Sequence, residues 1–272
     1  MAALALGACA VVAAAPAHAD GRGEGPVAGK AIIGGGKAKP AKWAFMAAVL
    51  RRGRLHCGGS VVAPTKVLTA AHCVEHFNPA NLAVVVGRTK LSARSAGQTV
   101  GVARAVAHPD FERNGRHDVG VLTLAAAVTV PAIALPTVEE DAAFGGSGRL
   151  LRVAGWGARN PFGISLSNRL KRTTERVRSN KRCRRAYRQL YSGRSMICAL
   201  GRKLGRFGRP AIHTTACSGD SGGPLVAETP LGPRVLGTVS YGGAFCGIAA
   251  APTVYSRVSD SLAFIAGQLA EP

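Results

Sequence analysis

A serine lies within a cluster of glycines at residues 219–224, which read Gly219-Asp220-Ser221-Gly222-Gly223-Pro224. Glycine permits tight backbone turns, so a hydroxyl held in such a turn can be exposed beside backbone amides that donate hydrogen bonds. A nucleophile that attacks a carbonyl carbon needs this environment. The same residues are compatible with an ordinary glycine-rich turn, so the motif indicates nucleophilic chemistry only if partner residues are present.

Two other segments supply the partners that a serine nucleophile requires. A serine hydroxyl reacts poorly unless a base accepts its proton, and the base needs a third group that fixes its tautomer. His72 lies in the segment Thr69–Cys73, and His117-Asp118 comes directly before the apolar run Val119–Leu124. Both segments place a titratable residue beside a strand-like run, so the sequence predicts acyl transfer by serine, histidine and aspartate. His117 competes with His72 for the role of the base.

The elements that must position these residues are short apolar runs rich in valine, which are typical of β-strands. With 35 glycines and 15 prolines in the chain, the pattern favours an all-β fold of many short strands joined by turns. A Pro-, Gly- and acid-containing stretch at 135–148 separates two sets of runs, and we expect a domain boundary there. Residues 259–269 fit one terminal amphipathic helix. The two sets lie at 60–62, 66–69, 82–86, 100–106 and 119–124, and at 150–154, 235–241 and 253–258.

The composition is that of a folded chain. Of the 272 residues, 47% are hydrophobic and 18% are charged, which excludes a disordered chain or a coiled coil and suffices for one large domain or two small ones. Residues 1–19 are mostly small and apolar and end in Ala17-His18-Ala19, which predicts an export signal cut before Asp20. This run is too short and too interrupted to cross a bilayer. We therefore expect a secreted protein without a membrane span.

Removing residues 1–19 leaves an even number of cysteines, which in an exported chain indicates three disulfides. Six cysteines allow fifteen pairings, and spacing alone does not choose among them. Their spacing does not fit a zinc site, and we expect neither a metal nor a cofactor. The six are Cys57, Cys73, Cys183, Cys198, Cys217 and Cys246.

From Ile32 onward the chain closely resembles the trypsin and chymotrypsin-like serine proteases. The segments that carry the resemblance occur in the order of the family: Ile32–Gly35, Cys57–Ser60, Thr69–Cys73, His117–Asp118, Gly155–Gly157, Gly219–Pro224 and Ser240–Gly242. The resemblance implies two antiparallel six-stranded β-barrels with the active site between them. Residues 32–136 would form the first barrel, and residues 137–272 the second barrel and the C-terminal helix.

The resemblance also assigns the chemistry. Ser221 is expected to be the nucleophile that forms an acyl-enzyme, and His72 the general base and then acid. Asp118 would orient the imidazole and accept a hydrogen bond from Ser240, while the amides of Gly219 and Ser221 would bind the oxyanion. His72 lies in the family motif and His117 does not, which decides between them.

Disulfide pairing is likewise taken from the resemblance, and it leaves no free thiol. It pairs Cys57 with Cys73, Cys183 with Cys198, and Cys217 with Cys246. No carboxylate lies between Leu82 and Pro109, so the calcium loop of some relatives, which needs acidic oxygen ligands, is not expected.

Members of this family are made as zymogens. Cleavage before Ile32 would free an amine that pairs with Asp220 and orders the oxyanion hole. The bond cut would be Ala31–Ile32, which departs from the family's usual cut after Lys or Arg, because Lys30 lies one residue too early. Either an enzyme that accepts alanine cuts this bond, or a cut after Lys30 is followed by removal of Ala31. Residues 20–31 are a propeptide in both cases.

Substrate preference is expected from a pocket formed by Thr215, Ser240, Tyr241, Gly242 and Thr253. Trypsin-like members carry an aspartate at the position of Thr215, so a preference for basic residues is not expected. Gly242 leaves one wall open, while Thr253 should project into the pocket and shorten it. The resemblance is then to an elastase-like pocket that takes small to medium aliphatic residues before the cut. An open chymotrypsin-like pocket is the alternative.

Positive charge is the chain's other marked feature, with 35 Lys and Arg against 14 Asp and Glu and a formal net charge of +21. It is densest at 169–194, where only Glu175 opposes it, and it continues at Arg202, Lys203, Arg206 and Arg209. This basic stretch is either a solvated surface or a surface that binds anionic polymers, cell envelopes or acidic substrates. Too few aromatic residues accompany it to support specific nucleic-acid binding. The basic residues of the dense interval are Arg169, Lys171, Arg172, Arg176, Arg178, Lys181, Arg182, Arg184, Arg185, Arg188 and Arg194.

The sequence therefore predicts a secreted serine endopeptidase, a monomer that acts on protein or peptide substrates. The competing function is an anionic-polymer-binding protein on a protease scaffold, in which catalysis is incidental.

Overall fold

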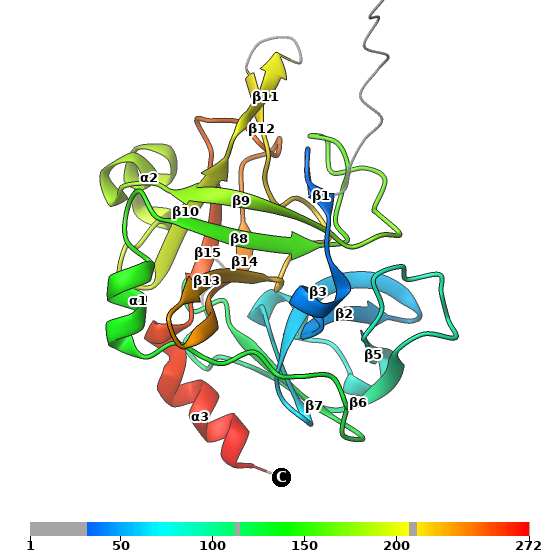
Figure 1. Ribbon diagram of the computed structural model, residues 1–272. Coiled ribbons are helices and arrows are strands. Elements are labelled where there is room, and N and C mark those ends of the chain that lie inside the picture. The colour runs from blue at the N-terminus through cyan, green and yellow to red at the C-terminus, as the bar shows by residue number, and fades with distance from the viewer. Residues whose placement is uncertain (1–31, 112–114, 207–210, 272) are drawn as a thin grey trace, which may run out of the picture.

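The computed structural model describes residues 32–111, 115–206 and 211–271, and these residues form two β-barrels with few helices (Figure 1). The predicted fold class is confirmed. The signal peptide and propeptide expected at 1–19 and 20–31 lie outside the described residues. The expected domain boundary at 136–137 falls after the last strand of the first barrel and directly before helix α1 (Val138–Phe144).

The first barrel is a closed antiparallel sheet with strand order β2-β3-β4-β7-β6-β5. Side chains alternate between its two faces, as the period of a strand requires. Ala47, Val49 and Val84 fill the inside of the barrel, whereas Ala48 and Val85 belong to a core that also contains residues of the second barrel. Both faces are buried, which explains the continuous apolar runs. The strands are β2 (Met46–Arg51), β3 (Arg54–Ala63), β4 (Lys66–Thr69), β5 (Leu82–Val86), β6 (Gln98–Ala107) and β7 (Gly120–Leu124).

The second barrel closes through six strands in the order β8-β9-β10-β15-β14-β13, with β13 paired back to β8. The short strand β1 (Gly36–Lys37) joins it by pairing with β9. Its interior holds Leu151, Ile197, Leu236 and Tyr255. The strands are β8 (Leu150–Gly155), β9 (Lys171–Val177), β10 (Met196–Gly201), β13 (Pro224–Thr229), β14 (Gly232–Tyr241) and β15 (Thr253–Arg257).

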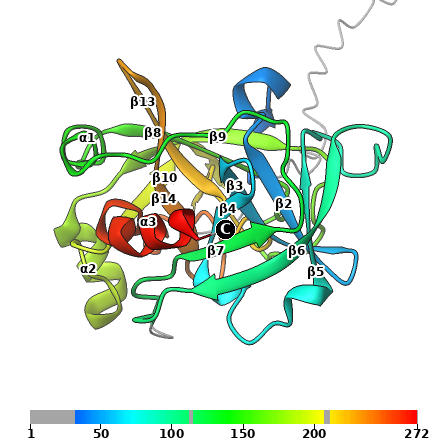
Figure 2. The same ribbon diagram turned by 90° about the horizontal axis from the view of Figure 1, so that it is seen from below.

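The chain ends in the expected helix, α3 (Leu262–Ala270), which packs on the first barrel although it follows the second (Figures 1 and 2). The ring of Phe264 lies 4.8 Å from that of His108, and Glu271 pairs with Arg104 of β6. This helix therefore ties the two barrels together at the end of the chain.

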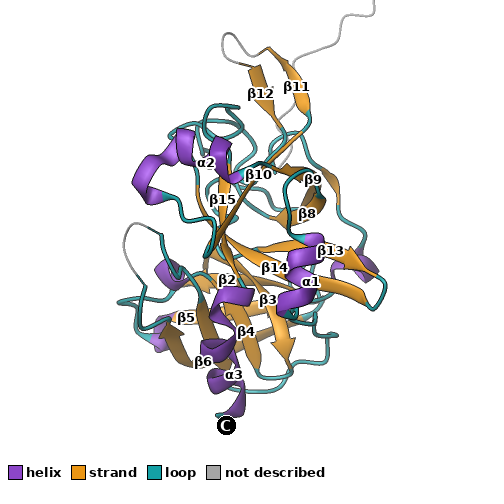
Figure 3. Cartoon of the chain, turned by 90° about the vertical axis from the view of Figure 1, so that its left-hand side faces the viewer, coloured by secondary structure: helices purple, strands orange, loops and turns teal. Residues whose placement is uncertain are grey.

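The remaining elements are two helices and a hairpin. α1 (Val138–Phe144) begins at a capping box made by Thr137 and Glu140, and α2 (Asn180–Tyr187) begins at the cap Ser179. β11 (Lys203–Arg206) and β12 (Ala211–His213) form a two-stranded sheet that projects from the second barrel (Figure 3). A bridge between Ile212 and Ile248 ties the base of this hairpin to the segment after Cys246.

Candidate active site

Asp118 and His72 are both positioned by the first barrel. Asp118 lies two residues before β7 and is 2% exposed, and His72 lies in a single helical turn at Ala71–Cys73 that follows β4. The backbone N–H of His72 donates to Asp118 Oδ1 at 2.9 Å, and Nδ1 of its ring lies 2.7 Å from Asp118 Oδ2. Because the carboxylate only accepts, Nδ1 is the donor, which leaves Nε2 of the neutral ring with a lone pair. His72 can therefore act as a base.

The second barrel adds a further hydrogen bond to the same carboxylate. Ser240 Oγ, at the end of β14, donates to Asp118 Oδ2 at 2.6 Å, and the neighbouring Thr238 donates to the Asp118 carbonyl at 3.3 Å. His117 does not take part in this network. Its ring stacks on His108 at 4.9 Å, and its Nδ1 lies 3.5 Å from Asp260.

Ser221 lies in a tight turn between the two barrels. Gly219 and Gly222 have φ angles of +88° and +76°, and a Cβ atom at Gly222 would lie 2.2 Å from Thr69 Oγ1. Only glycine fits there. The Ser221 carbonyl accepts a hydrogen bond from Gly58 N–H of β3 at 2.7 Å, which fixes the turn to the first barrel. Within the described residues, the amides of Gly219 and Ser221 donate to no protein acceptor, so both are available beside the hydroxyl.

Asp220, next to Ser221, is a buried carboxylate held by two backbone amides. Its Oδ1 accepts from Gly157 N–H at 2.7 Å and its Oδ2 from Cys217 N–H at 3.0 Å. Burial raises the pKa of Asp220 to about 7, and the two amides lower it by less. No cation pairs with this carboxylate among the residues that the structure describes. Within the described part of the chain, Asp220 therefore has no positive charge to balance it.

The residues after the expected cleavage point are docked in the second barrel. Ile32 is fully buried in that barrel's core, and Ile33 N–H donates to the Thr215 carbonyl at 3.0 Å. Ile32 has a φ of +45°, a strained value for a β-branched residue.

A cavity of about 160 Å³ opens beside Ser221, and its lining includes Ala216, Ser240, Tyr241, Gly242 and Thr253. Thr215 does not line this cavity. It is fully buried one layer deeper, and its hydroxyl lies 2.6 Å from that of Thr253. Four of the five expected pocket residues therefore line the cavity, whereas Thr215, expected at its base, is separated from it and contacts the lining residue Thr253.

One residue beside this pocket was missed by the sequence analysis, which counted Glu175 with the basic surface. Glu175 is fully buried inside the second barrel, and its Oε1 accepts from Ala216 N–H at 3.1 Å. The signal that could have found it is strand alternation: Thr173, Glu175 and Val177 of β9 are buried, whereas Arg172 and Arg176 are exposed.

Three disulfides brace these segments in the pairs that the resemblance implies, Cys57–Cys73, Cys183–Cys198 and Cys217–Cys246. The first holds the His72 turn against β3, and the third links the turn before Ser221 to the pocket wall. Cys57, His72 and Cys73 lie close together, but both thiols are consumed in the disulfide and cannot bind a metal.

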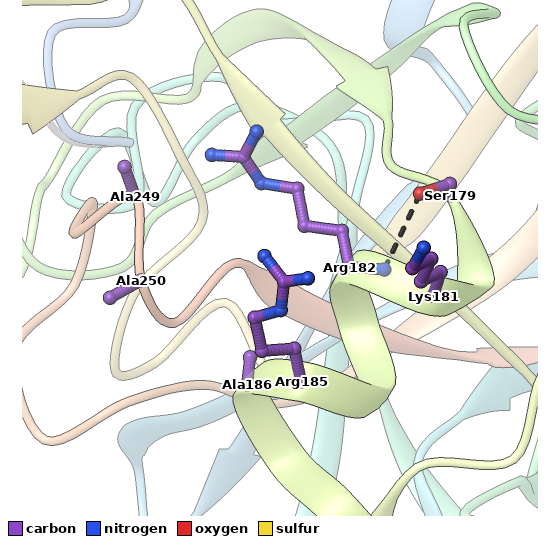
Figure 4. Close-up of a pocket in the computed structure, with 7 residues that line it drawn as sticks. All are labelled: Ser179, Lys181, Arg182, Arg185, Ala186, Ala249 and Ala250. Atoms are coloured by element: carbon purple, nitrogen blue, oxygen red, sulfur yellow. Dashed lines mark hydrogen bonds between the residues drawn. The ribbon is translucent and has the colours of Figure 1, made fainter.

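A second, larger hollow of about 570 Å³ lies between α2 and the segment with Ala249 and Ala250. The guanidinium groups of Arg182 and Arg185 project into it from α2 (Figure 4). Lys181 also lines it, and none of the three cations has an acidic partner among the described residues.

Comparison with known proteins gives consistent matches. The family model described as Trypsin matches residues 32–265. A trypsin of Saccharopolyspora erythraea is 34% identical over 229 residues, covering 84% of this chain and 93% of that protein. Transmembrane protease serine 5 of Homo sapiens is 35% identical over 254 residues, and the match covers 89% of this chain but only 52% of that protein. Glucanase inhibitor protein 2 of Phytophthora sojae is 30% identical over 259 residues, covering 93% of this chain and 83% of that protein.

Among the helices of the described residues, none is long and apolar enough to span a membrane.

Proposed function

The chain belongs to the trypsin family of serine endopeptidases, and from that premise we propose that Ser221, His72 and Asp118 carry out its peptide hydrolysis. The observation that carries this proposal is the hydrogen-bonded chain from Ser240 through Asp118 to His72 Nδ1. That chain fixes the imidazole tautomer and leaves Nε2 available to a hydroxyl.

The reaction follows from these positions. His72 Nε2 takes the proton of Ser221 Oγ while the oxygen attacks the carbonyl carbon of the scissile bond. Negative charge develops on the carbonyl oxygen, and the amides of Gly219 and Ser221 bind it, each donor contributing about 2.7–4 kcal/mol to the transition state. His72 then protonates the leaving amine, which gives an acyl-enzyme. Water, deprotonated by His72, releases the new carboxyl group and restores Ser221.

Activation is the second part of the proposal. Cleavage before Ile32 frees an amine that supplies the positive charge missing beside Asp220, since both residues are buried in the same barrel. The cut is made at Ala31–Ile32 directly, or after Lys30 with later loss of Ala31. Three disulfides and the small apolar residues at 1–19 support export of this precursor with a propeptide at 20–31.

Specificity is the third part. The cavity beside Ser221 has a volume of about 160 Å³, Thr253 lines it, and no acid lines it among the described residues. We expect small to medium aliphatic residues before the scissile bond.

A peptide panel tests this preference in protein that begins at Ile32. Peptides with Ala or Val before the cut should have kcat/KM at least about tenfold above those with Phe or Arg, because the larger side chains meet Thr253. Thr253→Gly removes that side chain and should raise the ratio of Phe to Ala turnover about tenfold or more. A wild-type preference for Phe or Tyr over Ala and Val would contradict the assignment of the pocket floor.

A second candidate function is binding of anionic polymers at the hollow beside α2. Lys181 and Arg182 lie in the first turn of α2, where the helix dipole disfavours cations, and that turn contains no acidic residue. An anion in the hollow would relieve this repulsion. One relative is named an inhibitor and not a protease, which keeps open a role in which binding matters more than turnover.

Substitution of three cations tests the polymer site. The triple variant Lys181→Gln, Arg182→Gln, Arg185→Gln should elute from immobilised heparin at lower salt concentration. The slope of log K for heparin binding against log salt concentration should become shallower by about one for each removed cation that contacts the polymer. Lys37→Gln, Lys39→Gln, Lys42→Gln removes the same charge from exposed positions elsewhere and should change elution less. If the elution salt concentration fell equally in the two triple variants, heparin binding would depend on the net charge of the protein and not on the hollow beside α2.

A Ser221→Ala protein separates the two functions. If a biological effect of the polymer-bound protein survives this change, then binding and not proteolysis produces the effect. Loss of the effect would support the protease.

A further inference from the structure

A hollow of about 450 Å³ lies on the outside of the second barrel, where β1, β9 and the end of β10 lie side by side (Figure 1). No residue that lines it also lines the cavity beside Ser221 or the hollow beside α2, so it is a separate site. Its volume is typical of pockets that take small molecules. We call it the arginine hollow after Arg172, Arg176, Arg178 and Arg202, which line it.

The arginine hollow carries positive charge without compensation. Arg172, Arg176 and Arg202 are exposed, and Arg178 is partly buried. None of these four forms an ion pair with an acidic residue in the described part of the chain. Glu175 precedes Arg176 on β9, but its side chain is buried inside the barrel and does not line the hollow. Because four like charges around one hollow repel one another, a bound anion would stabilise this arrangement.

Arg178 is a further sign that a ligand binds in this hollow. Its Nε atom is buried and has no hydrogen-bond partner in the described structure, so contacts within the protein leave its hydrogen bonding incomplete. Guanidinium groups bind phosphate and similar oxyanions through paired, charge-assisted hydrogen bonds. Since Arg178 lines the hollow, an oxygen-rich anion bound there can accept hydrogen bonds from its guanidinium group.

The walls of the hollow come from three segments that are far apart in sequence. Gly34 and Gly36 follow the expected cleavage point, Arg172 lies on β9, and Arg202 follows β10. Gly36 pairs with Arg172, which holds β1 on β9. No heavy atom lies within 4 Å of the position that a Cβ atom on Gly36 would take, so a ligand has room beside the backbone. An anion that fills the hollow therefore bridges the N-terminal segment to both strands.

We propose that the arginine hollow binds a compact anion that carries several phosphate or sulfate groups, and that this anion holds the segment 34–36 on β9. The binding depends neither on proteolysis nor on the hollow beside α2. Ile32 lies two residues before the segment, so the anion also favours the docked N-terminus that the proposed activation needs. That consequence alone rests on the proposed function.

Isothermal titration calorimetry of the full chain with inorganic tripolyphosphate tests the binding. Salt at about 0.15 M screens the weak attraction that any basic surface exerts. The triple variant Arg172→Gln, Arg176→Gln, Arg202→Gln should bind tripolyphosphate about tenfold more weakly or worse, because it loses charge-assisted hydrogen bonds. Sucrose octasulfate is titrated in the same way, and tighter binding of one probe identifies the preferred group as phosphate or sulfate.

A matched variant separates this site from the net charge of the protein. Arg52→Gln, Arg54→Gln, Arg94→Gln removes the same number of arginines from exposed positions on the first barrel and should weaken binding less than about twofold. If this control weakened binding as much as the arginine-hollow variant, or if neither probe bound to the wild type, the proposal would be overturned.

Hydrogen exchange measured by mass spectrometry tests whether the anion holds the N-terminal segment. At a tripolyphosphate concentration of about one hundred times Kd, the amides of residues 33–37 should exchange about tenfold more slowly or less, because opening of the segment then has to release the anion. The arginine-hollow variant should show no such slowing. Unchanged exchange in the wild type would overturn this part of the proposal. Neither measurement uses a substrate, so failure of the proposed protease activity would be seen separately.

Discussion

Replacing Ser221 with alanine is expected to lower kcat/KM for a peptide substrate by about 10⁴- to 10⁶-fold, because the variant has no atom that can form the acyl-enzyme. His72→Ala should cost a similar factor, since the hydroxyl then has no base. The two residues act as a unit, so the double variant should be no more than a few times slower than either single variant. Steady-state kinetics on protein beginning at Ile32 measures all three.

Controls separate lost chemistry from lost structure. Ser147→Ala and His76→Ala change the same residue types at exposed positions and should keep full activity. A fluorophosphonate, which reacts with activated serines, should label the wild type at Ser221 with one equivalent and leave Ser221→Ala unlabelled. Labelling at another serine, or near-normal turnover by folded Ser221→Ala, would assign the nucleophile elsewhere.

The fold could be predicted because its signals are local. Short valine-rich runs such as 82–86 indicate strands wherever they occur, and β5 has those bounds. The apolar spacing at 259–269 likewise predicted α3, although it did not reveal that the helix packs on the first barrel, because the contact between Phe264 and His108 joins residues far apart in sequence.

The candidate site could be predicted only in part. His72 and Asp118 are 46 residues apart, and no feature of the intervening sequence says that they meet at 2.7 Å. Their pairing came from a resemblance to known motifs, and not from periodicity or charge.

Counting charges was misleading for Glu175. Glu175 is the one acidic residue in the basic interval 169–194. Side chains alternate between the two faces of β9, however, so Glu175 is buried inside the barrel while Arg172 and Arg176 are exposed. The sequence analysis also counted Arg202, Lys203 and Arg206 only as positive charge, whereas residues 203–206 form the first strand of the hairpin β11–β12. Strands of four and three residues, with Gly205 at a φ of +142° inside β11, are too short and irregular to be predicted from periodicity.

Asp220→Asn, in protein that begins at Ile32, is expected to lower kcat/KM by about a hundredfold to several thousandfold. Removing one partner of a buried ion pair costs about 3–5 kcal/mol, and each 1.36 kcal/mol corresponds to about tenfold in rate. Asn keeps an oxygen that accepts from Gly157 N–H, so the turn before Ser221 retains that hydrogen bond while the charge that attracts the Ile32 amine is lost. Protein beginning at Ala31 is the matched control, because it moves the amine by one residue, and it should be as inactive as the variant.

The pH dependence of this pair distinguishes activation from a general loss of stability. Without a cation, burial raises the pKa of Asp220 to about 7. Above pH 7 the Asp220 carboxylate of the unprocessed chain is therefore a buried charge without a partner, and its buried position is disfavoured. With the free amine of Ile32, the pair lowers the pKa of the carboxyl group and raises that of the amine. The active conformation should therefore be present below the amine pKa and lost as the pH rises through it. Activity of the wild type should fall on this alkaline side, and the small residual activity of Asp220→Asn should not. If the wild type and Asp220→Asn lost the same fraction of their activity at alkaline pH, the Ile32 amine would not activate the enzyme through Asp220.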